Sequence, residues 1–255
     1  MLAEQRRRKI LELIQEEGSA KVSYLKTLFS VTEPTIRQDL DRLELDGHVV
    51  RRHGGAFLKS IPDQVRTLSL QRSQNMDKKK LLGIKAAEYI CNGDSVILDA
   101  GTTITEIARH LEGVNDLKVV TPALNIALIL GSCFNAQVML TGGEFKQPTL
   151  SVTGEKAAAF FDKSIALGKL FLAVVGISED GILSYPGLAD IPMKRAMITA
   201  AKEVFLVADS TKMGCVAFAN LGSIELVHHL ITDSGISRPY RELFESRGID
   251  VIIAD

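Results

Sequence analysis

The residues best suited to chemistry near the N-terminus lie in the segment TEPTIRQDLDR. Thr35, Gln38 and Arg42 recur at spacings of three and four, which puts them on one face of a helix. Threonine and glutamine near a helix N-terminus can hydrogen-bond to base edges in a DNA major groove, whereas Arg37, to the side, could reach only a phosphate. The same pattern is also typical of an ordinary solvated helix in which Arg42 pairs with Asp39.

A second group of such residues occupies four loops later in the chain, each after an apolar run. The loops are LDAGTT, LTGGE, VGISEDG and ADSTK, at residues 98–103, 140–144, 175–181 and 208–212. Gly101, Thr102 and Thr103 begin a predicted helix, so backbone N–H groups and two hydroxyls could hold an anion there. Lys212 could supply the counter-charge. Each loop alone suits an ordinary turn, but together they indicate a site for a phosphorylated small molecule.

Three short helices are predicted to hold the first group in place, because apolar residues follow helical spacing through residues 10–45. The predicted boundaries are Gly18 after the first helix, Ser23 as cap of the second, Thr32 as cap of the third with Pro34 in its first turn, and Gly47 after it. The following HVVRRHGGAF is typical of two strands that turn at Gly54 and Gly55.

This succession of helix, helix, turn, helix and basic hairpin is the geometry of a winged helix-turn-helix. We therefore predict that residues 1–58 form a DNA-binding domain. Its candidate DNA contacts are Ser23, Thr32, Thr35, Arg37, Gln38, Arg42, Arg51, Arg52 and His53.

Residues 59–77 show no strong periodicity and are predicted to be a linker. From residue 78 onward, helical stretches alternate with the apolar runs SVILDAG, LKVVT, AQVML, LFLAVVG, EVFLVAD, HHLIT and DVIIAD. This alternation predicts a mainly parallel sheet covered by helices on both faces, an α/β domain at residues 78–255. The four loops would then share the carboxyl edge of the sheet, where open α/β sheets bind ligands.

Composition narrows the class of protein. The chain has 46% hydrophobic and 24% charged residues, which suits one large core or a medium core with a small satellite domain. Its net charge of −1 means that any nucleic-acid site must be local. Three widely spaced cysteines form no metal or disulfide pattern, and no apolar run approaches the roughly 18 residues of a membrane span. We expect a cytosolic protein without a metal, a cofactor or a membrane partner.

The N-terminal segments RRRKILELIQEEG, VTEPTIRQDLDRLELDG and VVRRHGGAF resemble the DNA-binding domain of DeoR-family bacterial transcription regulators. That family has an early arginine in helix one, a TIRRDL-like recognition helix and an RxHGG wing. The resemblance covers nearly all of residues 3–58. Gln38 stands where the family commonly has arginine.

From about residue 78 onward, ILDAGTTITEIARHL, VVTPALNIA, LTGGEFK and MKRAMITAAKEVFLVADSTKMG resemble the effector domain of the same regulators. That domain is similar in fold to ribose-5-phosphate isomerase and the CoA-transferase group, and the resemblance implies binding of phosphorylated sugars. The implied effector contacts are Asp99, Gly101, Thr102, Thr103, Asn125, Gly143, Glu144, Asp209 and Lys212.

The likeness to isomerases raises the alternative of a sugar-phosphate enzyme with a vestigial DNA-binding domain. Aldose–ketose isomerisation needs a carboxylate base near the substrate carbons. In the related isomerases, a glutamate–lysine pair precedes the final strand by the interval at which Lys194 and Arg195 stand here, so a cation replaces the base. Asp190 and Glu179 could substitute. We predict binding without catalysis and count Lys194 among the effector contacts.

Taken together, these patterns predict a sequence-specific DNA-binding regulator, a repressor of a sugar-metabolism operon that a phosphorylated sugar controls. An activator of the same architecture is an alternative. One small winged helix covers too few base pairs for tight specific binding, so we also expect a homo-oligomer, a dimer or a tetramer, held together by the larger domain.

Overall fold

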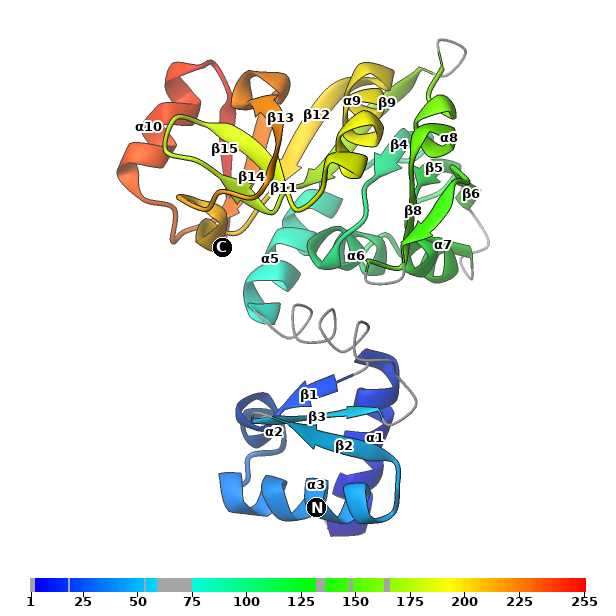
Figure 1. The fold of residues 1–255 in the computed structure, drawn as a ribbon, viewed down its shortest axis with the longest axis vertical. Coiled ribbons are helices and arrows are strands. Elements are labelled where there is room, and N and C mark those ends of the chain that lie inside the picture. The colour runs from blue at the N-terminus through cyan, green and yellow to red at the C-terminus, as the bar shows by residue number, and fades with distance from the viewer. Residues whose placement is uncertain are drawn as a thin grey trace. The chain divides into compact units, whose positions relative to one another are not determined.

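The computed structural model describes residues 3–17, 19–52, 54–58, 75–131, 136–146, 149–162 and 166–255. The chain divides into two compact units, Met1–Met76 and Asp77–Asp255 (Figure 1). Of the predicted linker, residues 59–74 lie outside the described residues, residue 75 precedes the first helix of the second unit, and residues 76 and 77 begin that helix.

The first unit consists, in its described part, of helices against a small antiparallel sheet. Its elements are α1 (Ala3–Glu17), β1 (Ser19–Lys21), α2 (Val22–Phe29), α3 (Glu33–Leu45), β2 (Val49–Arg52) and β3 (Gly55–Leu58). The strand order is β1-β3-β2. The three helices and the hairpin agree with the sequence prediction, whereas β1 was not predicted. The register pairs Arg52 with Gly55, so Gly55 is the first residue of β3 and not part of the turn, where it was predicted to lie.

The core of this unit lies between the three helices. Ile10, Leu25 and Leu40, one from each helix, have no solvent exposure. Beside them, the guanidinium of Arg6 donates to the carboxylate of Asp39 at 2.5 Å, and both side chains are almost completely buried. The predicted pair between Arg42 and Asp39 is therefore wrong: Asp39 faces the core.

Two helix starts differ in detail from the predicted caps. The N-cap of α2 is Lys21 rather than Ser23, because β1 leads directly into the helix; Ser23 is its second residue. Thr32 is the N-cap residue of α3, as predicted, but its hydroxyl hydrogen-bonds to the hydroxyl of Thr35 at 2.8 Å instead of capping the backbone. Gly18 lies outside the described residues.

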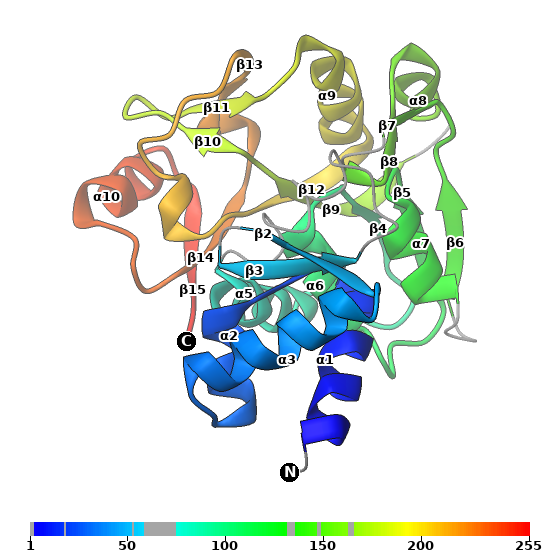
Figure 2. The same cartoon turned by 60° about the horizontal axis from the view of Figure 1, so that its bottom comes forward.

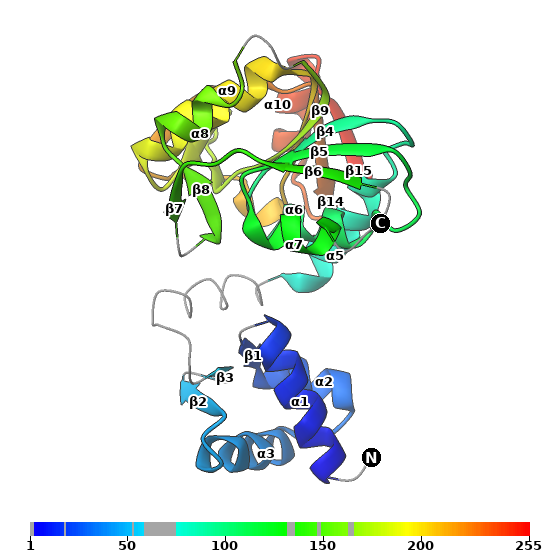
Figure 3. The same cartoon turned by 90° about the vertical axis from the view of Figure 1, so that its right-hand side faces the viewer.

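The second unit is built around a parallel sheet with the strand order β15-β14-β12-β9-β4-β5-β6. Its strands are β4 (Ser95–Leu98), β5 (Leu117–Thr121), β6 (Ala136–Leu140), β9 (Leu167–Ala173), β12 (Ala201–Val207), β14 (His229–Asp233) and β15 (Asp250–Ala254). Figure 3 shows β4, β5 and β6 of this sheet next to one another. All neighbouring pairs are parallel. Each strand falls on one of the seven predicted apolar runs, so the predicted α/β class is confirmed.

Helices cover both faces of this sheet. On one face lie α5 (Met76–Ala87), α6 (Thr102–Arg109) and α7 (Leu124–Gly131); on the other lie α8 (Glu155–Ala159), α9 (Ile191–Ala200) and α10 (Arg238–Ser246). Side chains of β9 alternate between the two layers, with Leu170 and Leu172 in one core and Phe171 in the other. Burial on both faces explains why these strands are continuous apolar runs.

Short elements beyond the main sheet were not predicted. Strands β10 (Gly176–Ile177), β11 (Ile182–Tyr185) and β13 (Ala219–Ser223) form a separate antiparallel sheet (Figure 2), and β7 (Glu144–Lys146) pairs with β8 (Ser151–Thr153). The short 3-10 turns η2 (Leu188–Asp190), η3 (Ser210–Lys212) and η4 (Ile224–Leu226) complete the unit. Several of these elements stand at the carboxyl edge of the main sheet, next to the predicted loops.

Candidate functional site

Helix α3 presents a polar face to solvent. Gln38 and Arg42 are exposed and Thr35 is half-buried, while Ile36 and Leu40 on the opposite side are fully buried. The three polar residues therefore share one accessible face, as their spacing predicts. Amide and hydroxyl groups on such a face can hydrogen-bond to base edges, although the Thr35 hydroxyl is bonded to Thr32 here.

Arginines near this face are paired with carboxylates on the same surface. Arg37 donates to Glu33 at 2.5 Å, and each side chain is about half exposed. The hydrogen bond and the charge of Arg37 lower the pKa of Glu33. Arg51, whose side chain is 24% exposed, pairs with the exposed Asp41. Exposed pairs of this kind contribute little to stability, so a DNA phosphate can replace the carboxylate at small cost.

The other N-terminal candidates lie around α3. Ser23 is exposed on α2. Arg42 pairs with Asp46 at 3.4 Å near the end of α3. Arg52 is the last residue of β2, and His53 lies outside the described residues.

In the second unit, a buried ion pair stands at the carboxyl end of β4. Asp99 has no solvent exposure, and its carboxylate accepts from the ammonium of Lys194 at 2.5 and 2.6 Å. The backbone N–H groups of Ala100 and Ala173 donate to the same carboxylate at 2.7 and 3.0 Å. These contacts compensate the burial of the charge. Two predicted effector contacts, Asp99 and Lys194, thus lie together but neutralise each other.

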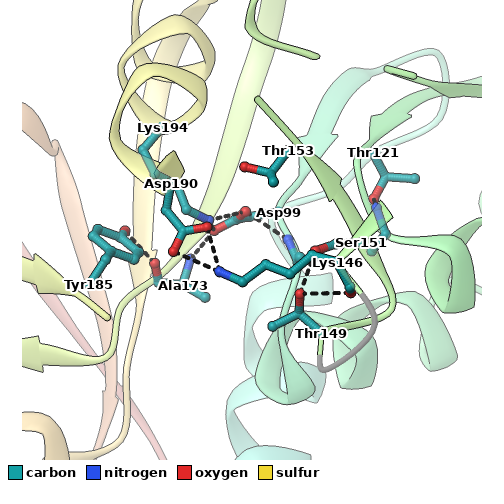
Figure 4. A network of polar contacts seen from close by, with 12 residues as sticks. Asp99, Thr121, Lys146, Thr149, Ser151, Thr153, Ala173, Tyr185, Asp190 and Lys194 are labelled. Carbon is teal, nitrogen blue, oxygen red and sulfur yellow. Dashed lines mark hydrogen bonds and ion pairs between the residues drawn. The ribbon is translucent and has the colours of Figure 1, made fainter. Parts of the chain in front are cut away.

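A second ion pair lies close to the first (Figure 4). Lys146, at the end of β7, donates to both carboxylate oxygens of Asp190 at 2.8 Å, and a third of its side chain is exposed. Hydroxyl side chains surround it: Thr149 and Ser151 hydrogen-bond to each other at 2.7 Å, and Thr153 donates to the carbonyl of Ala189. The arrangement offers a cation, a carboxylate and hydroxyls within one small region.

Tyr185 closes this region from the side of β11. The ammonium of Lys194 lies 5.1 Å from the centre of its ring, and its hydroxyl donates to the carbonyl of Ala173 at 2.6 Å. Burial, together with the negative charges of Asp99 and Asp190, raises the pKa of Tyr185 well above its ordinary value. The tyrosine is therefore neutral and acts as a hydrogen-bond donor and an apolar wall.

The predicted anion loop forms the start of α6. Gly101 has a φ of 141° and a ψ of 160°, a conformation that is essentially restricted to glycine, and no side chain caps the helix. The first N–H groups of α6 therefore lack intrahelical acceptors. Thr105 donates its hydroxyl to the Gly101 carbonyl and accepts from the amide of Asn125, which brings that predicted contact beside the first turn. Thr102 and Thr103 lie in the same turn.

The close packing around Gly143 explains why this position is a glycine. A Cβ atom there would lie 2.6 Å from the carbonyl oxygen of Thr153 and 2.8 Å from Ala157, so only glycine allows β8 and α8 to approach this loop. The neighbouring Glu144 begins β7 and is exposed. The LTGGE loop therefore positions the hairpin that carries Lys146.

The ADSTK loop stands at the carboxyl end of β12. Asp209 is buried and accepts from the backbone N–H of Thr211 at 3.0 Å. Lys212 is half-exposed, and within the described parts of the chain its ammonium has no ion pair. Strand β9 lies between β4 and β12, so the two loops predicted to form one phosphate site are two strand spacings apart, about 10 Å.

A further polar cluster ties this loop to α5. The ammonium of Lys78 donates to Ser210 and to Asp233, both at 2.8 Å, and the N–H groups of Ser210 and Gly235 donate to the same carboxylate. Burial disfavours ionisation of Asp233, but the hydrogen bonds from Lys78 and Ser210 outweigh it and lower its pKa to about 2.

Sequence reasoning missed several residues that the fold brings to this edge, above all Lys146, Tyr185 and Lys78. Lys146 follows the LTGGE motif by two residues, at the position where an alternating strand returns to the same side as Glu144. That spacing was the available signal. Asp190 was considered only as a possible base, whereas it is an ion-pair partner.

Comparison with known proteins now decides the family. The DeoR-like helix-turn-helix domain matches residues 6–61, and the DeoR C terminal sensor domain matches residues 74–234. The uncharacterized HTH-type transcriptional regulator YulB of Bacillus subtilis is 33% identical over 98% of this chain and 96% of its own length. The chain belongs to the DeoR family of transcriptional regulators. The resemblance inferred from the sequence motifs is thus confirmed.

Other relatives of this DeoR-family regulator include the glycerol-3-phosphate regulon repressor of Escherichia coli K12, 33% identical over 90% of both chains. A ribose 5-phosphate isomerase from Methanocaldococcus jannaschii is similar in fold, with 13% identity, a TM-score of 0.41 and 55% of each chain covered. In the described part of the regulator, no helix is long and apolar enough to cross a membrane.

Proposed function

We propose that this DeoR-family regulator is a repressor of a carbohydrate operon and that a phosphorylated sugar controls its affinity for operator DNA. The observation that carries the effector class is the carboxyl edge of the sheet, where Lys146 and the uncapped start of α6 stand among hydroxyl side chains. A cation and backbone N–H groups suit a phosphate, and a carboxylate such as Asp190 suits sugar hydroxyls. The name of the glycerol-3-phosphate relative supports this class of ligand.

For the DNA site, we infer that α3 enters the major groove. Gln38 would contact base edges through its exposed amide and Thr35 through its half-buried hydroxyl, and Arg37, Arg42 and Arg51 would exchange their carboxylate partners for phosphates. Ser23, Arg52 and His53 are proposed as further contacts to the phosphate backbone of the DNA.

The two sites would communicate by linkage. A ligand that binds one state of the regulator better than another shifts DNA affinity by its differential free energy, about 1–3 kcal/mol in typical allosteric proteins, or roughly 5- to 150-fold.

We further propose that the sensor unit joins at least two copies of the chain, because a single small DNA-binding domain supplies too few contacts for tight specific binding. Light scattering on the free protein and on its DNA complex tests this assembly; a strict monomer in both would contradict it.

The effector site is proposed to bind its ligand without catalysis. The buried carboxylate of the candidate sugar region, Asp99, is held in an ion pair with Lys194. An ionised carboxylate paired in this way is a weak base. Incubation of the protein with aldose phosphates, followed by NMR, should leave the sugars unchanged; conversion to ketose phosphates would support the enzyme alternative.

The central experiment measures operator affinity in the presence of candidate effectors. The operator is first selected from random duplex DNA, and its fluorescence anisotropy is then titrated with protein at fixed salt. Fructose 1-phosphate, fructose 6-phosphate, glucose 6-phosphate and glycerol 3-phosphate are added in turn, each beside its unphosphorylated counterpart. One phosphorylated compound is expected to shift the affinity by about 5- to 150-fold, and its counterpart is not. No selected operator, or equal effects of both compounds, would contradict the proposal.

Lys212 tests how far the effector site extends along the sheet edge. Lys212→Ala removes a charge that has no ion-pair partner among the described residues, so effector affinity should fall by roughly one to two powers of ten. Operator affinity without effector should stay unchanged. The exposed Lys202 serves as control, since Lys202→Ala should alter neither quantity. Equal effector binding by wild type and Lys212→Ala would remove Lys212 from the site.

A further inference from the structure

The two ion pairs of the effector region differ in how firmly they are held. The carboxylate of Asp99 has no exposure and four hydrogen bonds, two from Lys194 and two from backbone N–H groups. The side chains of Lys146 and Asp190 are 33% and 14% exposed. Separating the first pair would leave a buried charge uncompensated, whereas the second pair is open to an incoming ligand.

The second pair also joins two segments that the main sheet does not hold. Lys146 ends β7 of the small hairpin, and Asp190 ends η2 before α9. Figure 4 shows the Lys146 side chain extended from the hairpin toward Asp190, with Asp99 and Lys194 beside them. The hydroxyl of Thr153 adds one more link, to the carbonyl of Ala189 next to Asp190.

We propose that Lys146 and Asp190 are the specificity determinants of this site and that they select a ligand carrying both a phosphate and a hydroxyl group. This inference rests on the proposed function and assigns that site its selectivity. The phosphate takes the ammonium of Lys146 from Asp190, and the carboxylate released from the ion pair accepts a hydrogen bond from a ligand hydroxyl.

Selectivity follows from the exchange. A ligand with only a phosphate must separate Lys146 from Asp190 and leaves the partly buried carboxylate without a donor, which opposes binding. A polyol without a phosphate has no group that can replace Asp190 as the partner of the Lys146 ammonium, so the ion pair stays closed. Only a phosphorylated polyol satisfies both groups at once. The buried pair of Lys194 and Asp99 stays intact and keeps the surrounding loops in place.

The test compares inorganic phosphate and glycerol 3-phosphate as probes in calorimetry of the full chain. Asp190→Asn removes the anion that competes for Lys146, so its affinity for inorganic phosphate should rise by about tenfold or more, and its preference for glycerol 3-phosphate should shrink. Lys146→Gln should lose about tenfold or more in affinity for both probes. Circular dichroism and operator binding without ligand establish that each variant is folded.

Lys169 provides the matched control. It forms a similar half-buried pair with Asp94 at 2.7 Å near the opposite end of β9, so Lys169→Gln should leave both affinities unchanged. Unchanged phosphate affinity in Asp190→Asn, or equal losses in Lys146→Gln and Lys169→Gln, would overturn the inference. A wild type that binds operator but responds to no phosphorylated sugar would instead contradict the proposed function, whatever the phosphate affinity of Asp190→Asn.

Discussion

The exposed face of α3 and the carboxyl edge of the sheet both carry ion pairs, but the ion pairs of the two regions differ in how deeply they are buried. Arg37 and Glu33 on α3 are each about half exposed, whereas Lys194 and Asp99 at the sheet edge are 11% and 0% exposed. Water already screens the first pair, so its partners can separate at little cost. The second pair lies in the protein interior, where separation leaves a charge without solvation.

This difference matches what each region is proposed to bind. DNA phosphates are strong competitors for surface arginines, and a regulator that moves along DNA gains from pairs that exchange readily. A small ligand is selected by groups held in fixed positions, and the buried pair supplies such a framework. Lys146 and Asp190 lie between the two extremes, which is why the selectivity of the effector site was assigned to them.

Removing one partner of the buried pair should have the largest effect. Lys194→Met leaves Asp99 buried without its counter-charge, which is expected to lower the free energy of unfolding by about 3–5 kcal/mol. Urea denaturation followed by circular dichroism measures the loss. Lys85→Met, which breaks a pair with the exposed Glu88, is the control and should leave the free energy of unfolding almost unchanged.

The double variant Lys194→Met with Asp99→Asn refines this test. It removes the uncompensated charge together with the lysine, so it should recover part of the lost stability. A cost for Lys194→Met no greater than that of the Lys85 control would mean that the two regions do not differ in the way proposed here.

The sequence allowed the main fold to be predicted because its signals are long. Seven continuous apolar runs became the seven parallel strands, and helical spacing located the three N-terminal helices. Strands of two to four residues such as β10 and β11 carry too few positions for a periodic pattern, and β1 escaped notice for the same reason. Because β1 runs straight into α2, the cap was assigned to Ser23 instead of Lys21.

Ion-pair partners were the least predictable feature of the site. Lys194 and Asp99 are 95 positions apart in the chain, and Lys78 and Asp233 are 155 apart, so only the assembled fold brings them together. Local spacing instead suggested Arg42 and Asp39, three residues apart, yet Asp39 pairs across the core with Arg6. Loops that share a sheet edge could be predicted from topology, but not which charges would meet there.

Among substitutions on α3, the largest loss of operator affinity is expected from a residue that contacts base edges. Gln38→Ala should weaken binding to the selected operator by about 1–3 kcal/mol and leave binding to a scrambled duplex unchanged, because a base-edge contact carries sequence information. Fluorescence anisotropy on both duplexes measures the effect. The exposed Gln5 on α1 is the control, and Gln5→Ala should change neither affinity. An equal loss on both duplexes would assign Gln38 to phosphate contact only.

Asp233 offers a pH test of the buried clusters. Its pKa of about 2 is below the ordinary value near 3.8, so its stabilising contribution is fully present above about pH 5 and is lost as the pH falls toward 2. A third of the Lys78 side chain is exposed, and allowing for this screening we expect roughly 1–2 kcal/mol. Urea denaturation of wild type and Asp233→Asn should show this difference at pH 7 and its progressive loss as the pH falls through 2. A constant difference across that range would contradict the assignment.

The smallest expected effect is that of Arg37, and it tests the exposed pair directly. Arg37→Ala removes one phosphate contact, but in the free protein it also releases Glu33, so the net loss in DNA affinity should be less than about 1 kcal/mol and equal on the operator and on scrambled DNA. The salt dependence of binding is the more sensitive measurement. Each phosphate contact contributes about 0.9 to the slope of log affinity against log salt concentration, and the variant should lose about one such contact.

Glu33→Gln should act in the opposite direction, because it frees Arg37 from its surface partner before DNA binds. Affinity for both duplexes should therefore rise slightly at low salt and less at high salt. An unchanged slope in Arg37→Ala would show that Arg37 keeps Glu33 as its partner on DNA, and a loss confined to the operator would make it a base-reading residue.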